Sequence, residues 1–234
     1  VHFKKDKTGE ALKEEYTKGF FYSDCWVDDH RLVILNAIEA RNNGAVIEPY
    51  NECTKAEIKD DVWEVTTQNK TVKAKTLINA TGPWAQIFSD SAIPYDRKRH
   101  LKLVKGSHIV VPKMFDHGKS YIFQQEDGRI VFAIPYEENF TLIGTTDEPI
   151  NDEPSNASCT KEAEDYLCEA VNRYFKKQIS SKDIVWSYTG VRPLISEEME
   201  NESHKNTRDY AISLRQSEGA PLINIWGGKI TTYR

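Results

Sequence analysis

The chain has 234 residues, of which 39% are hydrophobic and 29% charged, and its formal net charge is −5. This length and apolar content suit one large or two small globular domains, and no stretch approaches the roughly 18 apolar residues of a membrane-spanning helix. Binding to DNA or RNA is not expected, because the 31 Lys and Arg residues are scattered among 36 acidic residues instead of forming a basic stripe.

The first part of the chain is typical of one α-to-β step in a layered sheet. Asp28 is suited to cap a helix that runs to about Asn43, and the apolar residues of this helix form a broad face. Gly44 follows, where a helix end favours a left-handed residue, and residues 45–47 read as a buried strand. A helix, a glycine and a short apolar strand together indicate an α/β layer.

A small hairpin and a further strand are predicted next. Residues 62–66 and 71–74 are strand-like and flank a turn, which predicts the hairpin. Residues 76–80 read as another strand. Gly82-Pro83 ends it, and a short helix at about residues 84–88 is expected to follow.

The middle of the chain consists of strand-like runs that follow one another closely. These runs are His108–Val111, Ser120–Gln124, Arg129–Ile134 and Thr141–Gly144. Short turns between them imply antiparallel pairing. Thr160 is suited to cap a helix to about Gln178, whose apolar residues recur at i, i+3 and i+4 and so cover one face of that sheet. Strands near residues 184–188 and 210–214 are expected to complete this unit.

Two architectures are therefore predicted to be interleaved, and the fold class is α/β plus α+β. An α/β layer is expected to hold residues 1–95 and to continue in residues 221–234, where residues 222–226 form a last strand. An antiparallel sheet with a helix is expected in residues 96–220. Ligands favour crevices between such domains.

Two glycine-containing turns are candidates for ligand binding. Gly227-Gly228-Lys229 follows the last strand, where glycines allow close backbone approach, helix N-terminal amides attract negative charge, and the lysine adds a cation. Thr81-Gly82-Pro83-Trp84 follows another buried strand. On their own, both are more often plain turns than ligand-binding segments.

Three basic side chains are candidates for chemistry on an anion. Arg192 lies in an apolar run, where its burial is costly unless an anion pairs with it. Arg208 opens a later strand, and two arginines suit bidentate phosphate binding, although Arg208 is equally suited to pair with Asp209. His108 begins an apolar strand, either as a general base or as a satisfied core histidine.

Cysteine, histidine and glycine spacing limit the chemistry further. The four cysteines and six histidines are dispersed, with no CxxC pair and no zinc-finger spacing. Reduced, packed cysteines and no structural metal are therefore expected. Neither a GxGxxG nor a GxxxxGK[ST] loop occurs, so these residues lack the usual phosphate cradle for a dinucleotide.

Seven segments, taken in order, resemble the FAD-dependent (aerobic, quinone-linked) glycerol-3-phosphate dehydrogenases. They are YSDCWVDDHRLVILNAIEARNNGA, LINATGPWA, LVKGSHIVVP, YIFQQEDGRIVFAIPYEENFTLIGTTD, VWSYTGVRPL, TRDY and GGKITTYR. They extend from about Phe21 to Arg234, and chance agreement of that length is negligible.

The resemblance implies a partial FAD domain of the glutathione-reductase type, with an antiparallel-sheet substrate domain above the flavin. It also implies the reaction: sn-glycerol 3-phosphate is oxidised to dihydroxyacetone phosphate by hydride transfer to FAD, and the electrons pass to membrane quinone. By the same resemblance, the full-length parent is cytoplasmic and peripherally membrane-associated. The oligomeric state stays open, with a homodimer as one option.

The resemblance assigns roles to individual residues. Arg192 and Arg208 match the substrate-phosphate arginines, and Lys229 matches an active-site lysine near substrate and flavin. His108 matches the histidine beside the reacting carbon, as a base or hydroxyl orienter, and Thr145 matches a pocket-lining threonine. The residues assigned to the cofactor are Thr81, Gly82 and Trp84 on a segment passing it, and Gly228, Ile230 and Thr231 at a turn facing the flavin ring.

The chain also departs from the family pattern. The glycine-rich FAD fingerprint, an arginine-tyrosine pair and the C-terminal helical cap are missing, so we expect a truncated piece that binds FAD poorly or not at all and is inactive alone. Three alternatives stay open. One is a glycerol-3-phosphate oxidase that uses oxygen, against which the short Ile195–Asn206 segment argues. The others are a non-catalytic fragment and a flavin amine or hydroxyacid oxidase with a carboxylate pocket.

Overall fold

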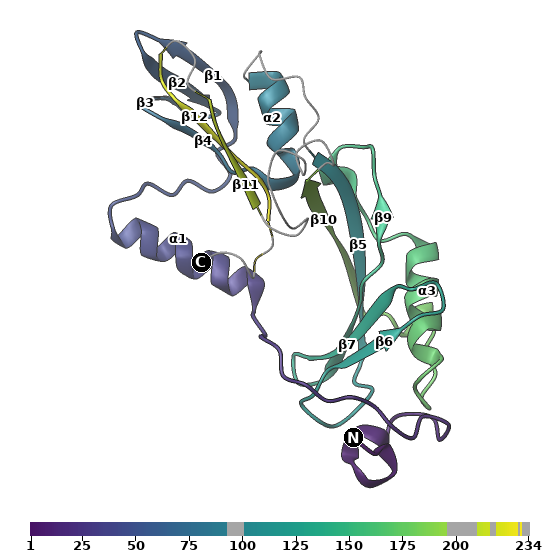
Figure 1. Ribbon diagram of the computed structural model, residues 1–234. Helices are drawn as coiled ribbons and strands as arrows, with labels where there is room; N and C mark the ends of the chain where they lie inside the picture. The colour runs from purple at the N-terminus through teal and green to yellow at the C-terminus, as the bar shows by residue number, and fades with distance from the viewer. Residues whose placement is uncertain (93–100, 196–209, 216–218, 229, 231–234) are drawn as a thin grey trace. The chain divides into compact units, whose positions relative to one another are not determined.

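The computed structural model describes residues 1–92, 101–195, 210–215, 219–228 and 230. The chain divides into two compact units (Figure 1). The first unit comprises Val1–Ser23 and Leu103–Arg192, and the second comprises Asp24–Lys102 and Pro193–Arg234. Among the helices of the described residues, none combines the length and hydropathy needed to cross a bilayer.

The first unit is built on a six-stranded sheet with the order β10-β5-β8-β7-β6, in which β9 also pairs with β5. The strands are β5 (Leu101–Pro112), β6 (Tyr121–Gln124), β7 (Ile130–Tyr136), β8 (Phe140–Gly144), β9 (Glu148–Pro149) and β10 (Trp186–Ile195). The pairs β5–β8, β8–β7 and β7–β6 are antiparallel, as the sequence predicts. One face is covered by α3 (Lys161–Asn172), whose Leu167 and Val171 share a core with Ile109 and Ile143 (Figure 1).

Helix α3 begins where the sequence predicts but ends earlier. The side chain of Thr160 accepts a hydrogen bond from the Ala163 amide at 3.3 Å, which confirms the predicted cap. The predicted end at Gln178 is wrong, because Asn172 binds the chain that follows. Its side chain accepts from the Ile179 amide at 2.8 Å and donates to the Ile179 carbonyl at 2.7 Å. These two bonds satisfy backbone groups that a longer helix would have paired internally.

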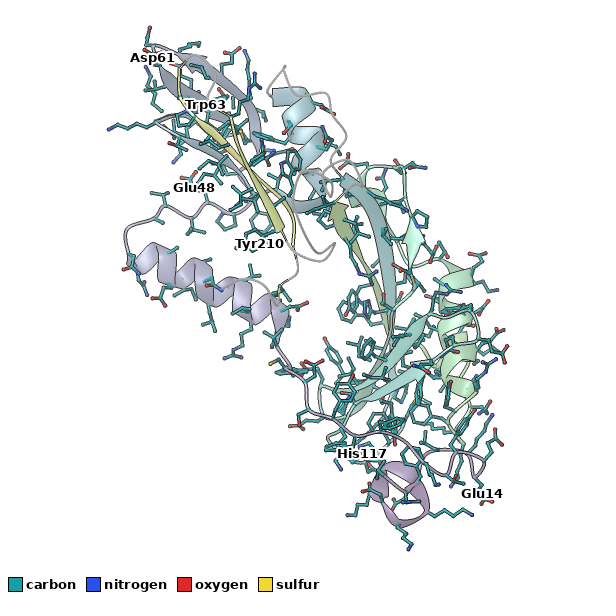
Figure 2. The ribbon with its side chains drawn as sticks, in the orientation of Figure 1. Glu14, Glu48, Asp61, Trp63, His117 and Tyr210 are labelled. Atoms are coloured by element: carbon teal, nitrogen blue, oxygen red, sulfur yellow. The ribbon has the colours of Figure 1, made fainter. Side chains whose placement is uncertain are left out.

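The N-terminal segment packs on the first unit and not on the α/β layer to which residues 1–95 were assigned. Leu12 is only 3% exposed and bridges to Phe175. The Tyr121 hydroxyl donates to the Thr8 carbonyl at 2.6 Å and contacts His117, the labelled histidine beside this segment in Figure 2. Burial raises the pKa of Tyr121, so its hydroxyl stays a donor. A single buried leucine in a polar stretch gives no periodic signal.

The second unit contains two three-stranded sheets. The first is antiparallel and consists of β1 (Cys53–Lys59), β2 (Val62–Thr67) and β3 (Thr71–Ala74). The second has the order β11-β12-β4, from β4 (Leu77–Asn79), β11 (Tyr210–Arg215) and β12 (Leu222–Gly227). A core around the buried Trp63 joins the two sheets, and its indole N–H donates to the Pro221 carbonyl at 2.9 Å (Figure 2).

The pairing of the second sheet confirms one prediction and corrects another. Strand β12 is parallel to β4, as an α/β layer requires. Strand β11, which the sequence placed with the antiparallel unit, pairs with β12 from Tyr210↔Gly227 to Arg215↔Leu222. Sequence spacing does not reveal which sheet a strand joins, because that depends on the partner strand and not on the strand's own residues. The predicted hairpin is present as β2 and β3, and β1 extends it.

Helix α1 (Asp29–Asn42) confirms the predicted cap, since the Asp28 carboxylate accepts from the Arg31 amide at 3.3 Å. The buried strand predicted at residues 45–47 is wrong. Val46 is 78% exposed, and among the described residues no strand pairs with this segment. A strand needs a neighbour for its backbone groups, so three apolar residues alone do not make one. The short helix predicted near Trp84 is present as α2 (Ala85–Ala92) after a turn of 3₁₀ helix.

Candidate functional site

Three of the predicted substrate-side residues lie on one face of the first unit's sheet. Side chains alternate along β5, and Ile109 belongs to the core beneath α3, so His108 points to the opposite face. His108 pairs directly with Gly144 at the end of β8. Thr145 follows that strand, and Arg192 comes from β10, the neighbour of β5 on its other side. The sheet thus brings together residues separated by more than 80 positions.

The guanidinium of Arg192 is held at two points. One nitrogen, Nη1, donates to Oδ1 of Asp147 at 2.7 Å, and the other, Nη2, donates to Oγ1 of Thr145 at 3.0 Å. The Thr145 hydroxyl in turn donates to the Thr146 carbonyl at 3.0 Å, which orients its lone pairs toward the arginine. A guanidinium carries five N–H donors in a fixed fork, so this geometry leaves donors for an anion.

The ring of His108 is half-buried and has a fixed plane. It stacks on Tyr188 of β10 with a centroid distance of 4.8 Å and an interplanar angle of 6°. Tyr188 and Arg192 are four residues apart on one strand and therefore lie on the same face. An imidazole held in this way presents its ring nitrogens in a fixed direction as hydrogen-bond donor or acceptor.

Buried hydroxyl groups connect the strands beneath this face. The Ser107 amide donates to Oγ1 of Thr146 at 2.9 Å, and the Ser107 hydroxyl lies 2.9 Å from the Thr189 hydroxyl. Ser107 is fully buried and Thr146 almost so. Satisfied buried hydrogen bonds of this kind rigidify a site.

Sequence reasoning missed Asp147, Tyr188 and the buried hydroxyls. The resemblance segments contain all of these residues, but their partners become visible only once the strands are paired.

In the second unit, the two predicted glycine turns follow neighbouring parallel strands. β4 ends at Asn79 opposite Asn224 of β12. Thr81-Gly82 follows β4, and Gly228 follows Gly227, the last residue of β12. Gly82 and Gly228 have φ values of +58° and +91°, which side chains rarely adopt. Open α/β sheets bind ligands outside the carboxyl ends of their strands. These turns therefore occupy a position suited to a cofactor.

A buried amide network supports the first of these turns and was missed from the sequence. Asn79 is 1% exposed, and its amide nitrogen lies 3.0 Å from both the Ala85 carbonyl and Oδ1 of Asn224. Its Oδ1 accepts from the Thr81 hydroxyl at 2.7 Å. Ser89 adds a further buried contact at 3.2 Å. The network ties β4, β12 and α2 to the turn that carries Thr81.

Replacing Asn79 with alanine should destabilise the protein by about 1–3 kcal/mol, because Asn224 and Thr81 would lose a buried partner. Urea unfolding measures this change. The matched control is Asn36→Ala, whose exposed amide on α1 bonds only to the Leu32 carbonyl among the described residues, and which should change stability by less than about 0.5 kcal/mol. Equal effects of the two substitutions would contradict the assignment.

Some of the predicted site residues lie outside the described residues: Arg208, Lys229, Thr231 and the segment 196–206. Two other predicted cofactor residues are described. Trp84 is exposed at the end of a 3₁₀ turn, and Ile230 is half-buried.

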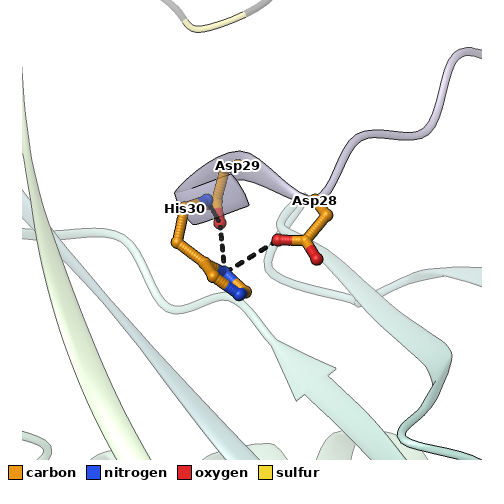
Figure 3. Close-up of side chains that lie close together, drawn as sticks. All are labelled: Asp28, Asp29 and His30. Atoms are coloured by element: carbon orange, nitrogen blue, oxygen red, sulfur yellow. Dashed lines mark hydrogen bonds and ion pairs between the residues drawn. The ribbon is translucent and has the colours of Figure 1, made fainter. Parts of the chain in front are cut away.

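The four cysteines are free thiols, as predicted, but the prediction that they are packed holds fully only for Cys168, since Cys25 is exposed and Cys53 and Cys159 are half-buried. Burial raises the pKa of the Cys168 thiol to about 11, which favours an inert, packed role. Among the described residues, one group has potential metal-ligand spacing: Asp28, Asp29 and His30 (Figure 3). Nδ1 of His30 lies 2.9 Å from Oδ1 of Asp28, but this carboxylate caps α1 and the histidine is exposed. Helix capping accounts for this cluster.

Comparison with known proteins gives consistent matches over nearly the whole chain. The family described as FAD dependent oxidoreductase matches residues 4–234. The chain is 44% identical to a glycerol-3-phosphate dehydrogenase from Pseudomonas tolaasii, over 95% of this chain and 44% of that protein. It is 41% identical to a D-erythritol 1-phosphate dehydrogenase from Brucella abortus, over 100% of this chain and 48% of that protein.

A solved structure agrees with these relatives. The glycerol-3-phosphate dehydrogenase from Bacillus halodurans, complexed with FAD, matches with a TM-score of 0.81 and 31% identity, over 100% of this chain and 46% of that one. The chain thus spans less than half the length of these relatives. Because the family match covers residues 4–234, the chain belongs to the family of FAD-dependent oxidoreductases.

Proposed function

We propose that this chain supplies the substrate-phosphate side of an FAD-dependent glycerol-3-phosphate dehydrogenase. The proposed reaction oxidises sn-glycerol 3-phosphate to dihydroxyacetone phosphate. The observation that carries the proposal is the guanidinium of Arg192, held between Asp147 and Thr145 on the same sheet face as His108. The first unit is then the substrate domain and the second unit part of the FAD-binding domain.

The proposed site combines a phosphate-binding arginine with a histidine that acts on the substrate hydroxyl. Arg192 pairs with the phosphate, and Thr145 lines the pocket beside it. Arg208 and Lys229 add positive charge in this proposal, since a dianion is best held by about two or three fixed cations. His108, oriented by its stack on Tyr188, takes the proton of the C2 hydroxyl or holds that hydroxyl in place. FAD, when bound, supplies the chemistry of accepting the hydride from C2.

The residues after β4 and β12 are suited to face the cofactor. Gly82 and Gly228 adopt left-handed φ values, and a side chain at Gly82 would meet no atom within 4 Å, so its backbone leaves room for a ligand. Amide groups there can stabilise negative charge on a reduced flavin. The residues proposed for this role are Thr81, Gly82, Trp84, Gly228, Ile230 and Thr231.

The proposed electron acceptor is membrane quinone, with the full-length protein peripherally attached to the cytoplasmic face of the membrane. A homodimer is the proposed assembly. The names of the similar relatives support a dehydrogenase over an oxidase. An assay of the full-length protein with glycerol 3-phosphate should show dye or quinone reduction, whereas rapid peroxide formation without quinone would favour the oxidase.

D-erythritol 1-phosphate is a second candidate substrate, supported by the 41% identity to the Brucella abortus enzyme. Both substrates are polyol phosphates, so Arg192 could bind the phosphate group of either one. The two are distinguished by comparing kcat/KM in one preparation. We expect glycerol 3-phosphate to have the higher value, and the reverse order would reassign the substrate.

The 234-residue chain by itself should bind FAD weakly and show no dehydrogenase activity. The reason is that its sequence contains no glycine-rich phosphate loop of the dinucleotide-binding type. The chain should therefore purify without visible flavin absorbance and gain little when FAD is added. The full-length protein, prepared in parallel, is the control. Flavin copurifying with the isolated chain at full occupancy would contradict this prediction.

A further inference from the structure

Two glycines lie directly beneath the proposed catalytic face. Gly106 is on β5, two residues before His108 and on the same face, and Gly144 is the last residue of β8, directly opposite His108. Glycine inside a strand weakens it, because it has high conformational freedom and no side chain to pack. Two glycines on neighbouring strands therefore suggest that other side chains occupy the volume in which their own side chains would lie.

The atoms around the two glycines identify these side chains. A Cβ atom on Gly106 would lie 2.4 Å from Nη2 of Arg192 and 2.4 Å from Oγ1 of Thr145. A Cβ atom on Gly144 would lie 2.0 Å from Cδ2 of His108, and its three nearest atoms all belong to that ring. All three distances are far shorter than van der Waals contact. Any side chain at these positions would displace the arginine or the imidazole.

We propose that Gly106 and Gly144 are positioning residues for the reaction. Gly106 lets the Arg192 guanidinium lie flat across β5 and reach Thr145, and Gly144 lets the His108 ring lie over the end of β8 in its stack on Tyr188. The assignment rests on the proposed function, because it gives Arg192 the phosphate and His108 the reacting hydroxyl. The two glycines should consequently affect different kinetic constants.

The first test is a kinetic split in the full-length, flavin-loaded protein. Gly106→Ala should raise KM for glycerol 3-phosphate about tenfold with little change in kcat, because a charge-assisted contact is weakened. Gly144→Ala should lower kcat about 100-fold, since displacement of a reacting group by about 1 Å costs on that order. Gly118→Ala, in the exposed loop between β5 and β6, is the control and should change neither constant, because a Cβ there meets no atom within 4 Å and the loop lies outside the proposed face. Equal effects of Gly106→Ala and Gly118→Ala would overturn the role of Gly106.

The second test does not depend on activity. Gly144→Ala should lower the unfolding temperature, because the new methyl group collides with His108. In a His108→Ala background the same substitution should produce no further drop, since the collision partner is absent. An equal drop in both backgrounds, or none in either, would overturn the role of Gly144.

The outcomes separate the two proposals. If the wild-type protein fails to oxidise glycerol 3-phosphate, the proposed function falls. The unfolding comparison still decides whether Gly144 accommodates the His108 ring.

Discussion

Replacing Arg192 with alanine should raise KM for glycerol 3-phosphate about 10- to 100-fold in the full-length protein. Hydrogen bonds to charged groups contribute about 1.5–3 kcal/mol, and each 1.4 kcal/mol or so is a factor of ten in binding. The substitution also leaves Asp147, now without its ion pair at 2.7 Å, beside the phosphate. Repulsion between the two anions adds to the loss. Steady-state dye reduction measures the effect.

Two further variants sharpen this experiment. Removing the carboxylate as well, in the double variant with Asp147→Ala, should recover part of the lost affinity. Arg192→Lys should fall between wild type and Arg192→Ala, because an ammonium keeps the charge but not the planar fork.

The matched control is Arg173→Ala. Arg173 is equally exposed, 38% against 39%, and pairs with Glu126 at 3.1 Å, yet it lies at the end of α3 and away from the proposed face. It should leave KM unchanged. A KM that is unaffected by loss of Arg192, or equally raised by loss of Arg173, would argue against the phosphate role.

Local signals in the sequence were sufficient for much of the fold. The Thr160 cap, the β2–β3 hairpin and the antiparallel runs of the middle region were all predictable, because capping, turn chemistry and alternation depend on neighbouring residues. The two glycine turns were equally visible. Their position at the ends of parallel strands follows from the predicted α/β layer, which the pairing of β4 with β12 confirms.

What the sequence could not supply were contacts between distant segments. The strand predicted at residues 45–47 had the right composition but has no paired strand among the described residues, and composition does not reveal whether a partner exists. The N-terminal segment is anchored through the buried Leu12, whose partner Phe175 is more than 160 residues away. Propensity and periodicity are local quantities, so they carry no information about such pairs.

In the candidate site, too, some residues were predictable from the sequence, and the residues that support them were not. His108, Thr145 and Arg192 were predicted from resemblance, and the sheet brings them together, but their supporting residues depend on strand register. Tyr188 contacts His108 only because β10 lies beside β5, and a shift by one residue would turn its ring to the opposite face. The reactive and substrate-binding side chains were therefore predictable from the sequence, whereas the side chains that orient them were not.

Replacing Phe175 with alanine should destabilise the protein by about 3–5 kcal/mol, because a fully buried ring would leave a cavity. The ring meets Tyr121 and Phe123 edge-on at centroid distances of 5.2 and 5.3 Å and stacks with Phe115 at 5.8 Å. These contacts lie between the end of α3 and the sheet, so no single neighbour can fill the space. Urea unfolding with an unchanged m value would measure the loss.

The same substitution should also loosen the N-terminal segment before the whole protein unfolds. Leu12 packs in the same core as Phe175, and the Lys13 amide donates to the Tyr174 carbonyl at 2.9 Å, so both contacts depend on the chain around residue 175. Trypsin should therefore cleave after Lys13 faster in Phe175→Ala than in wild type at low denaturant. Phe20→Ala is the control, since that ring is fully exposed and its loss should change stability by less than about 0.5 kcal/mol. If cleavage after Lys13 is unchanged while global stability falls, the segment is held by other contacts than this core.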